Sequence, residues 1–403
     1  MAADAAMRVL HIGKFYPPHP GGIERTSADL CAGLAARNVD VAMLAHAEPG
    51  ERKTTETRVD NVAITRVACF GQLVYAPISP TFPLHLKNVL AEFRPDLVHV
   101  HVPNTSAFWA LLSSAAKRIP WVVHWHADIP IDSRHAGLRF AYRVYRPWEL
   151  ALLRRAAAIV ATSPDYADSS DVLRPWRDKV NVIPLGIADR DASGDPQSAN
   201  RVTWPESSLR VLAVGRLSYF KGFDVLLRAI AKVPEAHLVL IGDGECMSDL
   251  RRLAGQLGIE SRVEFVGRID MTADGKARLD AAYASADIFC LPSTERAESF
   301  GIVLLEAMRA GKAILASAIP GSGVNHVVRD GETGLMVRPG DPRELADAMC
   351  RLRDDAPFRE RLGTAGRRRF VDEFTLDSSV DRTLALYREI LEVPHPATTT
   401  RAS

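Results

Sequence analysis

Residues 209–222 read LRVLAVGRLSYFKG: a short apolar run ends at Gly215, and a loop with two cations, Arg216 and Lys221, follows. A strand that leads through such a loop into a helix is the repeating unit of a parallel α/β sheet. Five further runs of this kind follow, with helical patterns between them, at 236–242, 262–267, 287–292, 312–317 and 334–339. This rhythm predicts a doubly wound α/β domain over 209–374.

The same rhythm precedes this domain. Seven apolar runs, separated by helical patterns such as 23–38 and 105–118, lie at 8–13, 39–44, 62–67, 96–101, 121–126, 157–162 and 180–184. Residues 189–208 are polar and aperiodic, as expected of a linker. We therefore predict two Rossmann-like domains, 7–188 and 209–374, facing each other across a cleft at the carboxyl ends of their strands. At the C-terminus we predict a helix, 375–392, that packs back on the first domain, and a disordered tail, 393–403.

The composition narrows the class of protein. Among 403 residues, 50 are Lys or Arg and 49 are Asp or Glu, a balance that argues against a dedicated nucleic-acid-binding protein. No apolar run approaches the roughly 18 residues of a membrane-spanning helix, and the N-terminus lacks the features of a signal peptide. The five cysteines show no Cys-x-x-Cys spacing. We therefore expect free thiols, a cytoplasmic location and no metal site.

Arg216 and Lys221 lie on the loop between a strand end and a helix that begins near Gly222. Two cations beside a helix N-terminus suit a di-anion such as a diphosphate. The alternative is that both are solvated loop residues, and their spacing alone does not separate the two hypotheses. A dinucleotide-dehydrogenase site fits less well, because GDGECM and GSGVNH both lack the third glycine of the Gly-x-Gly-x-x-Gly pattern.

Two glutamates bracket the segment ESFGIVLLE, residues 298–306. A helix that begins near Gly301 places Glu298 just before its first turn and Glu306 in its second turn. A carboxylate accepts hydrogen bonds from two neighbouring hydroxyls, so these residues suit the two diols of a nucleotide-sugar. The alternatives are a partner of the helix dipole for Glu298 and a solvated residue for Glu306. Because this helix is apolar most of the way round, however, Glu306 needs a partner.

The order of these motifs resembles a known family. GRLSYFKG, LIGDGE, FVGR and ESFGIVLLEAMRAGKAILAS occur together as in the retaining nucleotide-sugar glycosyltransferases of family 4, which have the GT-B fold. The resemblance runs from about residue 8 to 392. It implies that a hexose, such as mannose or glucose, moves from a nucleoside diphosphate sugar to a hydroxyl acceptor with retained configuration. We expect no metal or other cofactor.

The resemblance also implies roles for individual residues. The donor-binding residues would be Gly22, Gly215, Arg216, Lys221, Gly267, Arg268, Glu298, Phe300, Gly301, Ile302 and Glu306. Among them, Arg216 and Lys221 would bind the diphosphate, Glu306 the ribose and Glu298 the transferred sugar. Backbone amides at 300–302 would hold sugar and phosphate.

The base and the chemical step follow less directly. The loop at 267–268 would line the base, but segment 268–287 is longer than expected for the family, so the base, in UDP or GDP, stays open. The chain offers no obvious nucleophile and no suitably placed Asp-x-Asp metal motif. We therefore expect a same-face displacement in which Arg216, Lys221 and helix-end amides stabilise the leaving diphosphate.

In the first domain, FYPPHPGGIERTSADL, residues 15–30, follows the first strand. Gly21 and Gly22 precede a helix there and would let the loop approach a diphosphate closely. The alternative is an ordinary turn with a flexible cap. The resemblance favours ligand contact, mainly at Gly22.

The segment WVVHWHADIP, residues 121–130, puts His124 and His126 on one face of a strand, with His126 at its carboxyl end. A lone histidine of this kind is more often a core residue than a catalyst, but a strand end in this fold faces the ligand. The resemblance places His126 beside the transferred sugar, as a catalytic residue, and Asp128 near the acceptor. His99 and His101, at another strand end, are weaker candidates. His11 is expected to be a buried structural residue.

Residues 134–155, RHAGLRFAYRVYRPWELALLRR, combine six arginines with four aromatic residues. One interpretation is a helix with solvated arginines and aromatic rings that pack inward. The other is a basic, aromatic face that contacts an anionic membrane surface.

Together these patterns predict a retaining hexosyltransferase, with catalytic residues His126, Glu298, Arg216 and Lys221. Its partners would be a nucleotide-sugar, a glycan or lipid-linked glycan of bacterial polysaccharide synthesis, and the anionic inner face of a membrane, without nucleic acid. Two alternatives belong to other classes. A sugar-nucleotide epimerase would turn over without an acceptor, and a non-catalytic sugar-nucleotide binder would not need His126.

Overall fold

The computed structural model describes residues 6–73, 76–129, 136–190, 204–206, 209–270 and 272–393. The chain divides into two compact units, Met1–Leu185 with Leu376–Ser403, and Gly186–Thr375. Most of the predicted linker, 189–208, and all of the predicted tail except Val393 lie outside the described residues. Each unit is described on its own below.

The first unit is built on an eight-stranded sheet in the order β10-β9-β8-β7-β1-β2-β4-β3. Its strands are β1 (Arg8–Ile12), β2 (Asp40–His46), β3 (Thr55–Val59), β4 (Val62–Val67), β7 (Leu97–Val102), β8 (Trp121–Trp125), β9 (Ala158–Ala161) and β10 (Val180–Val182), beside a small pair, β5 (Gln72–Leu73) and β6 (Ala76–Pro77). Its helices are α1 (Gly22–Ala35), α2 (Phe82–Phe93), α3 (Phe108–Leu112), α4 (Ala136–Arg155), α5 (Pro164–Ser169) and α13 (Leu376–Glu392). All seven predicted apolar runs form strands of this sheet.

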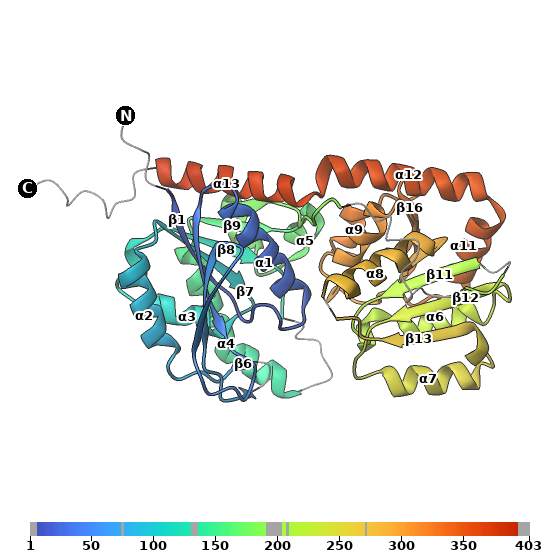
Figure 1. Ribbon diagram of the computed structural model, residues 1–403, viewed down its shortest axis with the longest axis horizontal. Helices are drawn as coiled ribbons and strands as arrows, with labels where there is room; N and C mark the ends of the chain where they lie inside the picture. Colours follow the sequence, from blue (N-terminus) through green and yellow to red (C-terminus); the bar gives the residue numbers. More distant parts are fainter. Residues whose placement is uncertain are drawn as a thin grey trace, which may run out of the picture. The chain divides into compact units, whose positions relative to one another are not determined.

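Helices cover both faces of the first sheet. On one face, α1 and α13 lie side by side (Figure 1), and Leu34, Val380 and Tyr387 are buried between these helices and the strands. On the other face, α2, α3 and α4 bury side chains such as Leu86 and Leu152. Each such leucine contributes about 1.5–3 kcal/mol when it leaves water. The strands between the helices are therefore apolar on both faces, which explains their nearly unbroken apolar runs.

Two features of the first unit differ from the sequence prediction. Residues 105–118 do not form one helix, because two 3-10 turns, Thr105–Ala107 and Ala116–Arg118, flank the short α3. The Ser113 hydroxyl accepts the backbone N–H of Ala116 at 3.2 Å and so replaces a helical bond. Strand β3 was not predicted, because it is polar and exposed at the sheet edge. Its signal is the turn at residues 60–61, where both residues have positive φ, as in tight hairpins.

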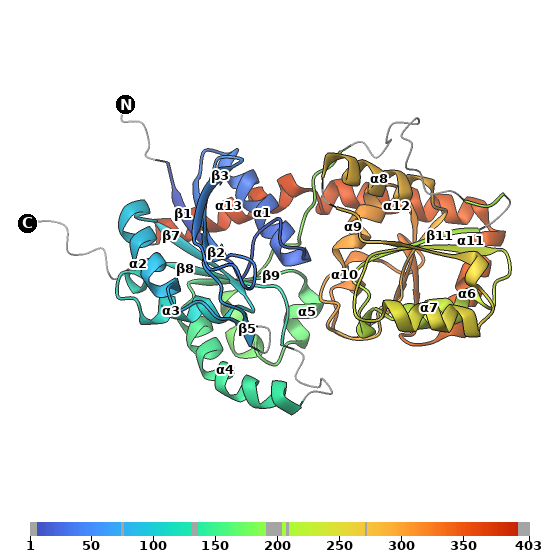
Figure 2. The same cartoon turned by 60° about the horizontal axis from the view of Figure 1, so that its bottom comes forward.

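The second unit contains a six-stranded parallel sheet in the order β13-β12-β11-β14-β15-β16. Its strands are β11 (Leu209–Val214), β12 (Ala236–Ile241), β13 (Val263–Gly267), β14 (Ile288–Leu291), β15 (Ala313–Ser317) and β16 (Gly334–Val337). Its helices are α6 (Phe223–Ile230), α7 (Met247–Gln256), α8 (Ala273–Ser285), α9 (Ile302–Arg309), α10 (Val324–Val327), α11 (Pro342–Asp354) and α12 (Ala356–Glu373). All six predicted strands are present, and α6 and α7 lie on one side of the sheet with α8 on the other (Figure 2).

Both units are doubly wound α/β sheets, so the predicted fold class is confirmed. The long segment 268–287 is occupied by α8, whose first turn is capped by the Thr272 hydroxyl, an acceptor for the Gly275 N–H at 3.2 Å. The five cysteines are free thiols, as expected.

Candidate functional site

In the second unit, the strand order reverses between β11 and β14. The loop that carries Arg216 and Lys221 follows β11, and the loop at 292–301 follows β14, so both lie at the carboxyl edge of the sheet. Ligands of open parallel sheets bind at this edge, where the winding changes direction.

Lys221 and Glu298 form an ion pair at this point of the sheet. Lys221 Nζ lies 2.5 Å from Glu298 Oε2, and the two side chains are 13% and 8% exposed. The Ser293 hydroxyl donates to the same carboxylate oxygen at 2.8 Å, and the Ser322 hydroxyl donates to the backbone carbonyl of Glu298. Lys221 is therefore not a solvated loop cation. The structure brings the predicted diphosphate-binding cation and the predicted sugar-binding carboxylate into one hydrogen-bonded group.

Arg216 is placed differently. Its side chain is 72% exposed, and its Nη2 lies 3.4 Å from Oε2 of Glu245 on the loop after β12. The next residue, Leu217, is buried, and its backbone bonds to Asp243 and Cys246 hold the loop. An exposed ion pair of this kind contributes little to stability. The guanidinium can therefore leave Glu245 for a stronger anion at little cost.

The helix α9 begins four residues after Glu298. Gly301 precedes it with a φ of 76°, and a Cβ there would lie 2.8 Å from Leu304 Cδ1 and 3.0 Å from Leu291 Cδ2, so the backbone and its packing require glycine. Phe300 is buried. The first backbone N–H groups of a helix have no partner within it, so those near Gly301 and Ile302 suit an anion.

Glu306 lies in the second turn of α9, as predicted, and is only 2% exposed. The Tyr283 hydroxyl, from α8, donates to Glu306 Oε2 at 2.9 Å. A carboxylate so deeply buried requires hydrogen-bond donors. The expectation that Glu306 has a partner is therefore confirmed, and the alternative of a solvated helix residue is wrong.

The remaining donor-side residues lie at strand ends. Gly215 follows β11, and Gly267, with a φ of 78°, ends β13, followed by the exposed Arg268. Because β12 separates β13 from β11, the Gly267 loop lies about 10 Å along the edge, at about 4.8 Å per strand. It lies on the side of the Lys221 loop that faces away from Glu298. The order along the edge is thus the one expected for base, diphosphate and sugar.

In the first unit, the strand order reverses between β1 and β7, and α1 follows β1. Gly22 is the first residue of α1, and a Cβ built there meets nothing within 4 Å. Packing of the described residues therefore does not require glycine at this position, unlike at Gly301. Open space at a switch point favours the close approach of a ligand.

His126 directly follows β8 and is buried. Its backbone N–H donates to the carbonyl of Val102 at 3.2 Å. The ring stacks on that of His124, with centroids 4.1 Å apart and planes 10° apart, so the two histidines share one face of the strand, as predicted.

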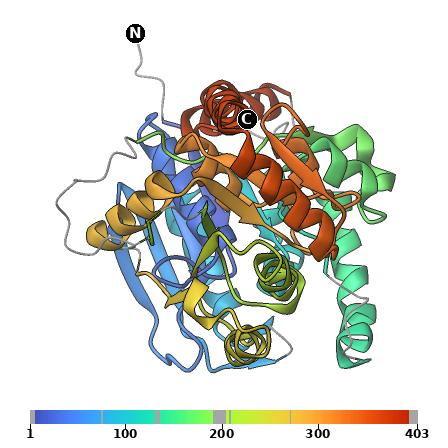
Figure 3. The same ribbon diagram turned by 90° about the vertical axis from the view of Figure 1, so that its right-hand side faces the viewer.

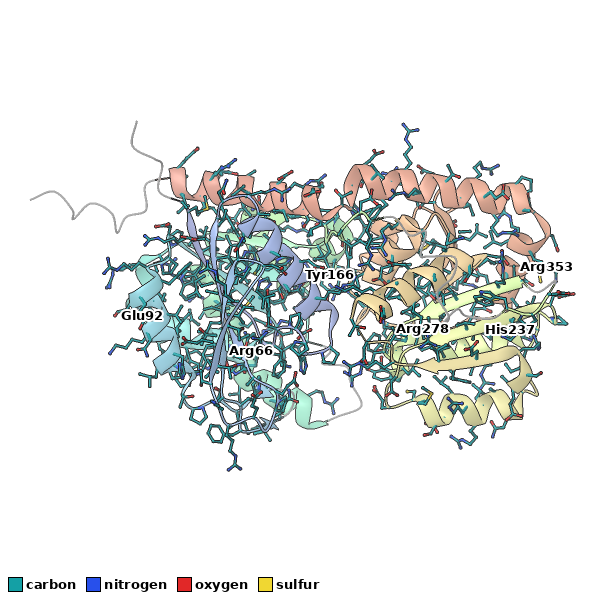
Figure 4. The ribbon with its side chains drawn as sticks, viewed as in Figure 1. Arg66, Glu92, Tyr166, His237, Arg278 and Arg353 are labelled. Atoms are coloured by element: carbon teal, nitrogen blue, oxygen red, sulfur yellow. The ribbon has the colours of Figure 1, made fainter. Side chains whose placement is uncertain are left out.

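Asp128 lies two residues further along the chain. Its Oδ1 accepts hydrogen bonds from Trp125 Nε1 and from the Ser170 hydroxyl, both at 2.8 Å. Its backbone N–H donates to the hydroxyl of Tyr166, a residue labelled in Figure 4, at 2.7 Å. Two side-chain donors therefore orient the candidate acceptor-side carboxylate, and Tyr166 holds the backbone of the same residue.

His126 belongs to a cluster of five buried histidines on three neighbouring strands. The members are His11 on β1, His99 and His101 on β7, His124 on β8 and His126 directly after β8. The register pairs His11 with His99, and His101 with His124, so their rings stack in one layer. This cluster was not predicted from the sequence, because it depends on the strand order β8-β7-β1.

One row of hydrogen bonds, called here the first row, runs from His11 to His126. His11 Nδ1 is 3.0 Å from His101 Nε2, and His101 Nδ1 is 3.0 Å from His126 Nε2. The nitrogens at the two ends, His11 Nε2 and His126 Nδ1, are buried and have no hydrogen-bond partner among the described residues. Burial lowers the pKa of His11 to about 3, and it lowers the pKa of His101 and His126 well below the ordinary value. All three rings are therefore neutral near pH 7.

A second row joins Tyr387 of α13 to His99 and His124. The Tyr387 hydroxyl is hydrogen-bonded to His99 Nδ1, and His99 Nε2 is 3.2 Å from His124 Nδ1. Burial lowers the pKa of His124 to about 3 and that of His99 well below the ordinary value. Within the described part of the chain, no hydrogen bond joins the two rows.

Comparison with known proteins identifies the family. The model described as "Glycosyl transferase 4-like domain" matches residues 21–186, and "Glycosyl transferases group 1" matches residues 195–369. The O-antigen chain mannosyltransferase C of Escherichia coli is 30% identical over 388 residues, which cover 96% of this chain and 99% of that protein. The chain belongs to glycosyltransferase family 4.

Two other relatives of this glycosyltransferase agree. The D-rhamnosyltransferase WbpZ of Pseudomonas aeruginosa is 31% identical over 376 residues, 92% of each chain. The phosphatidyl-myo-inositol mannosyltransferase of Mycobacterium leprae is 32% identical over 360 residues, 86% of this chain and 87% of that protein. All three relatives are named as sugar transferases. The protein is a hexosyltransferase, and the alternatives of an epimerase or a binding protein gain no support.

Solved structures identify the fold of the glycosyltransferase as GT-B. Sucrose-phosphate synthase of Thermosynechococcus elongatus superimposes with a TM-score of 0.76 at 23% identity, over 96% of this chain and 100% of that one. Anabaena Alr3699/HepE, solved in complex with UDP and glucose, has a TM-score of 0.70 at 21% identity, over 95% and 99%.

Helix α4 of the glycosyltransferase contains a buried carboxyl group that was not predicted from the sequence. Glu149 is buried, and the Tyr142 hydroxyl donates to its Oε2 at 2.9 Å. Burial and the nearby charge of Asp128 raise the pKa of Glu149 to about 7, although the bond from Tyr142 opposes the shift. The available signal was that Glu149 is the only acidic residue among the arginines of 134–155.

The outer side of α4 supports both interpretations of the arginine-rich segment in part. Tyr142 is buried and Tyr145 packs on Phe108, with ring centroids 4.9 Å apart, as in an ordinary helix. Phe140, however, is 70% exposed. Between residues 139 and 148, the exposed side chains other than Pro147 are called here the α4 face: Arg139, Phe140, Arg143, Val144, Arg146 and Trp148. The helix stands at the outer edge of its unit (Figures 2 and 3).

Proposed function

We propose that this hexosyltransferase uses a nucleoside diphosphate sugar as donor and transfers its hexose, with retained configuration, to a hydroxyl of a lipid-linked glycan. The observation that carries the donor assignment is the Lys221–Glu298 pair at the switch point of the second sheet. A buried ammonium and a carboxylate side by side match the two parts of a sugar diphosphate. The ammonium suits the phosphates, and the carboxylate suits the sugar hydroxyls.

The other donor contacts follow from this anchor. Arg216 would turn from Glu245 to the diphosphate, and the amides near Gly301 would meet the phosphate or the sugar. Glu306 Oε2 holds the Tyr283 hydroxyl, and the carboxylate would also accept from the ribose. The named complex of Alr3699/HepE with UDP and glucose supports a donor of this kind for a GT-B protein.

In the proposed reaction, the acceptor hydroxyl attacks the anomeric carbon from the side on which the diphosphate leaves. The bond from that carbon to the phosphate oxygen breaks, and the acceptor proton passes to the departing phosphate. Negative charge grows on the diphosphate during this step, so Lys221, Arg216 and the helix-end amides stabilise the transition state more than the bound donor.

The acceptor assignment rests on the relatives and on the α4 face. Two relatives are named for O-antigen chains and for phosphatidyl-myo-inositol. Among the described residues, no helix is both long and apolar enough to cross a bilayer. On the α4 face, arginines and exposed rings lie together, a combination that suits anionic headgroups and the bilayer interface. Each basic residue near such a surface contributes about 1 kcal/mol, so three suffice for reversible attachment.

Radiolabelled UDP-glucose and GDP-mannose, each incubated with and without a bacterial lipid extract, test the reaction. Label that enters the lipid fraction only when extract is present supports the proposal. Conversion of the sugar without extract would identify an epimerase, and binding without turnover in any mixture would identify a binding protein.

Sedimentation with phosphatidylglycerol vesicles tests the membrane contact. We expect the wild type to sediment at low salt, and both Arg139→Ser/Arg143→Ser/Arg146→Ser and Phe140→Ser to stay in solution. A variant with the same charge change at exposed positions of the second unit, Arg251→Ser/Arg252→Ser/Arg368→Ser, is the control and should sediment like the wild type. If the two triple variants behave alike, the α4 face is ordinary helix surface and a soluble acceptor becomes the better hypothesis.

A further inference from the structure

We propose that His101, supported by His11, is a positioning residue that fixes the tautomer of His126. In this arrangement His126 offers its Nδ1–H to an oxygen of the transferred sugar. The inference rests on the proposed function and on the family resemblance, which places His126 beside that sugar. It is carried by the first row, in which both ring nitrogens of His101 are engaged and only the end nitrogens lack partners.

A neutral imidazole has one N–H donor and one lone-pair acceptor. Because His101 bonds through both nitrogens, it must donate with one and accept with the other. The first row therefore has two neutral states. In the first state, His11 donates to His101 and His101 donates to His126, whose proton then sits on Nδ1. In the second state, every bond is reversed, and His126 carries its proton on Nε2.

A ligand decides between these states. Without one, each state leaves one buried N–H without a partner, at His126 Nδ1 in the first state and at His11 Nε2 in the second. A sugar oxygen at His126 Nδ1 pairs that N–H in the first state, and only a lone pair at His11 stays unpaired. The second state would keep an unpaired buried N–H at His11. In folded proteins, buried N–H groups without a partner are rarer than buried acceptors without one. Binding of the nucleotide-sugar therefore selects the first state.

The row holds a tautomer and does not carry a proton away. If His126 took up a proton at Nδ1 and passed its Nε2 proton along the row, the positive charge would finish on His11. That ring is fully buried among neutral imidazoles, and burial strongly opposes its charged form. His126 therefore acts as a neutral hydrogen-bond donor that orients the sugar.

A metal ion is the competing occupant of the cluster. The ring nitrogens of His11, His99 and His101, and those of His101, His124 and His126, lie within 4.8 Å of one another. A metal would take the lone pairs on which the hydrogen bonds depend. It would also bring two positive charges among neutral rings, and neither triplet contains a carboxylate to balance them. The hydrogen-bonded row needs no such compensation.

The test combines a spectroscopic and a kinetic measurement on the full chain. Protein labelled with ¹⁵N-histidine, in which the signals of His126 are identified by their loss in His126→Gln, reports which nitrogen carries the proton. On addition of the turnover-supporting donor, UDP-glucose or GDP-mannose, we expect a protonated Nδ1 and an unprotonated Nε2. His101→Phe should abolish this preference and lower kcat about tenfold, the factor of one lost hydrogen bond, with a smaller change in KM.

Two further variants separate positioning from packing. His101→Gln keeps one donor and one acceptor and should recover most of the activity and the Nδ1–H tautomer. His99→Phe, in the second row, makes the same change of a buried histidine without touching a bond to His126, so it should leave the tautomer as in the wild type. If His101→Phe fails to fold, the wild-type spectrum and His101→Gln still decide.

An Nε2–H tautomer of His126 in the donor complex overturns the proposal. So does equal behaviour of His101→Phe and His99→Phe, or tight binding of one zinc ion per chain that His101→Phe abolishes. The proposed function fails on a different result, namely no transfer of label from either sugar donor when the lipid extract is present. His126→Ala with full turnover would remove the sugar contact alone, whatever tautomer the wild-type spectrum shows.

Discussion

Replacing Glu298 by glutamine should tighten the binding of a free nucleoside diphosphate and yet lower sugar transfer. Lys221 Nζ lies 2.5 Å from the Glu298 carboxylate. A phosphate oxygen that bound Nζ from its other side would lie about 5 Å from this carboxylate. Two like charges at that separation repel by about 3 kcal/mol at an effective dielectric constant of about 20. Glu298→Gln removes that repulsion and keeps the shape of the side chain, so we expect affinity for the free diphosphate to rise up to about a hundredfold.

Lys221→Met should weaken the binding of the free nucleoside diphosphate. It removes a charge-assisted contact worth about 2–3 kcal/mol and leaves the largely buried Glu298 carboxylate with Ser293 as its remaining side-chain donor in this group. The double variant Lys221→Met/Glu298→Gln should bind the diphosphate better than Lys221→Met alone, because it lacks the Glu298 carboxylate that repels the phosphates. Full donor, which needs the carboxylate for its sugar, should be turned over poorly by all three variants.

Calorimetry with UDP, GDP and ADP measures these affinities, and transfer assays with the matching sugar donors measure turnover. Asp287→Asn is the control, because Arg210 and Asp287 form a 2.5 Å ion pair at the amino ends of the same two strands, β11 and β14. It should leave diphosphate affinity unchanged. If Glu298→Gln weakens the free diphosphate as much as Lys221→Met does, Glu298 contacts the nucleotide and the order of base, diphosphate and sugar is wrong.

Three further predictions concern other positions. Gly22→Ala should change the free energy of unfolding in urea titrations by less than about 0.5 kcal/mol, because a Cβ there meets nothing within 4 Å. The same change should weaken binding of the nucleotide-sugar about tenfold by calorimetry. Unchanged affinity would mean that Gly22 belongs to an ordinary turn. Glu306→Ala should weaken UDP or GDP and the full donor by the same factor, and a loss confined to the full donor would move Glu306 to the sugar. In the folded protein the pKa of Glu149 is about 7, whereas in the unfolded chain the same carboxyl ionises near pH 4. Between pH 4 and pH 7 the folded state therefore holds a proton that the unfolded state has lost, so the free energy of unfolding falls as pH rises through this range. Glu149→Gln should remove that fall, about 3 kcal/mol between pH 4 and pH 7, and parallel stability curves for both proteins would count against it.

The strands and the donor-side residues were predictable from the sequence for a simple reason. Parallel strands buried on both faces read as unbroken apolar runs, and each run ends where its loop reaches the ligand edge. Lys221, Glu298 and Glu306 were therefore identified at a strand end, before a helix and inside a helix. The need of Glu306 for a partner followed from the apolar helix around it, although Tyr283 as that partner did not.

What the sequence left undetermined depends on which elements become neighbours. The Lys221–Glu298 pair requires β11 beside β14, and the histidine cluster requires β8, β7 and β1 in that order. Neither strand order can be inferred from how far apart these residues lie in the sequence. The predicted helix at 105–118 was wrong for a local reason, since Ser113 offers its own hydroxyl to the backbone. Glu149 escaped notice because its burial comes from tertiary packing, whereas the arginines around it suggest an exposed helix.

Because α13 belongs to the first unit, the ribosome synthesises that unit in two separate parts, one before and one after the second unit. Gly186–Thr375 is one continuous stretch and can complete its sheet while the residues that follow it are still inside the exit tunnel. Until α13 emerges, the apolar side of α1 lacks its cover, and Arg37 lacks its two ionic partners on that helix, Asp377 and Asp381. The nascent first unit must therefore wait, with apolar surface open to chaperones or to aggregation, for roughly the time needed to make the whole second unit. A premature stop after Thr375 would accordingly spare the second unit and disable the first, although every strand of the first unit had already been made.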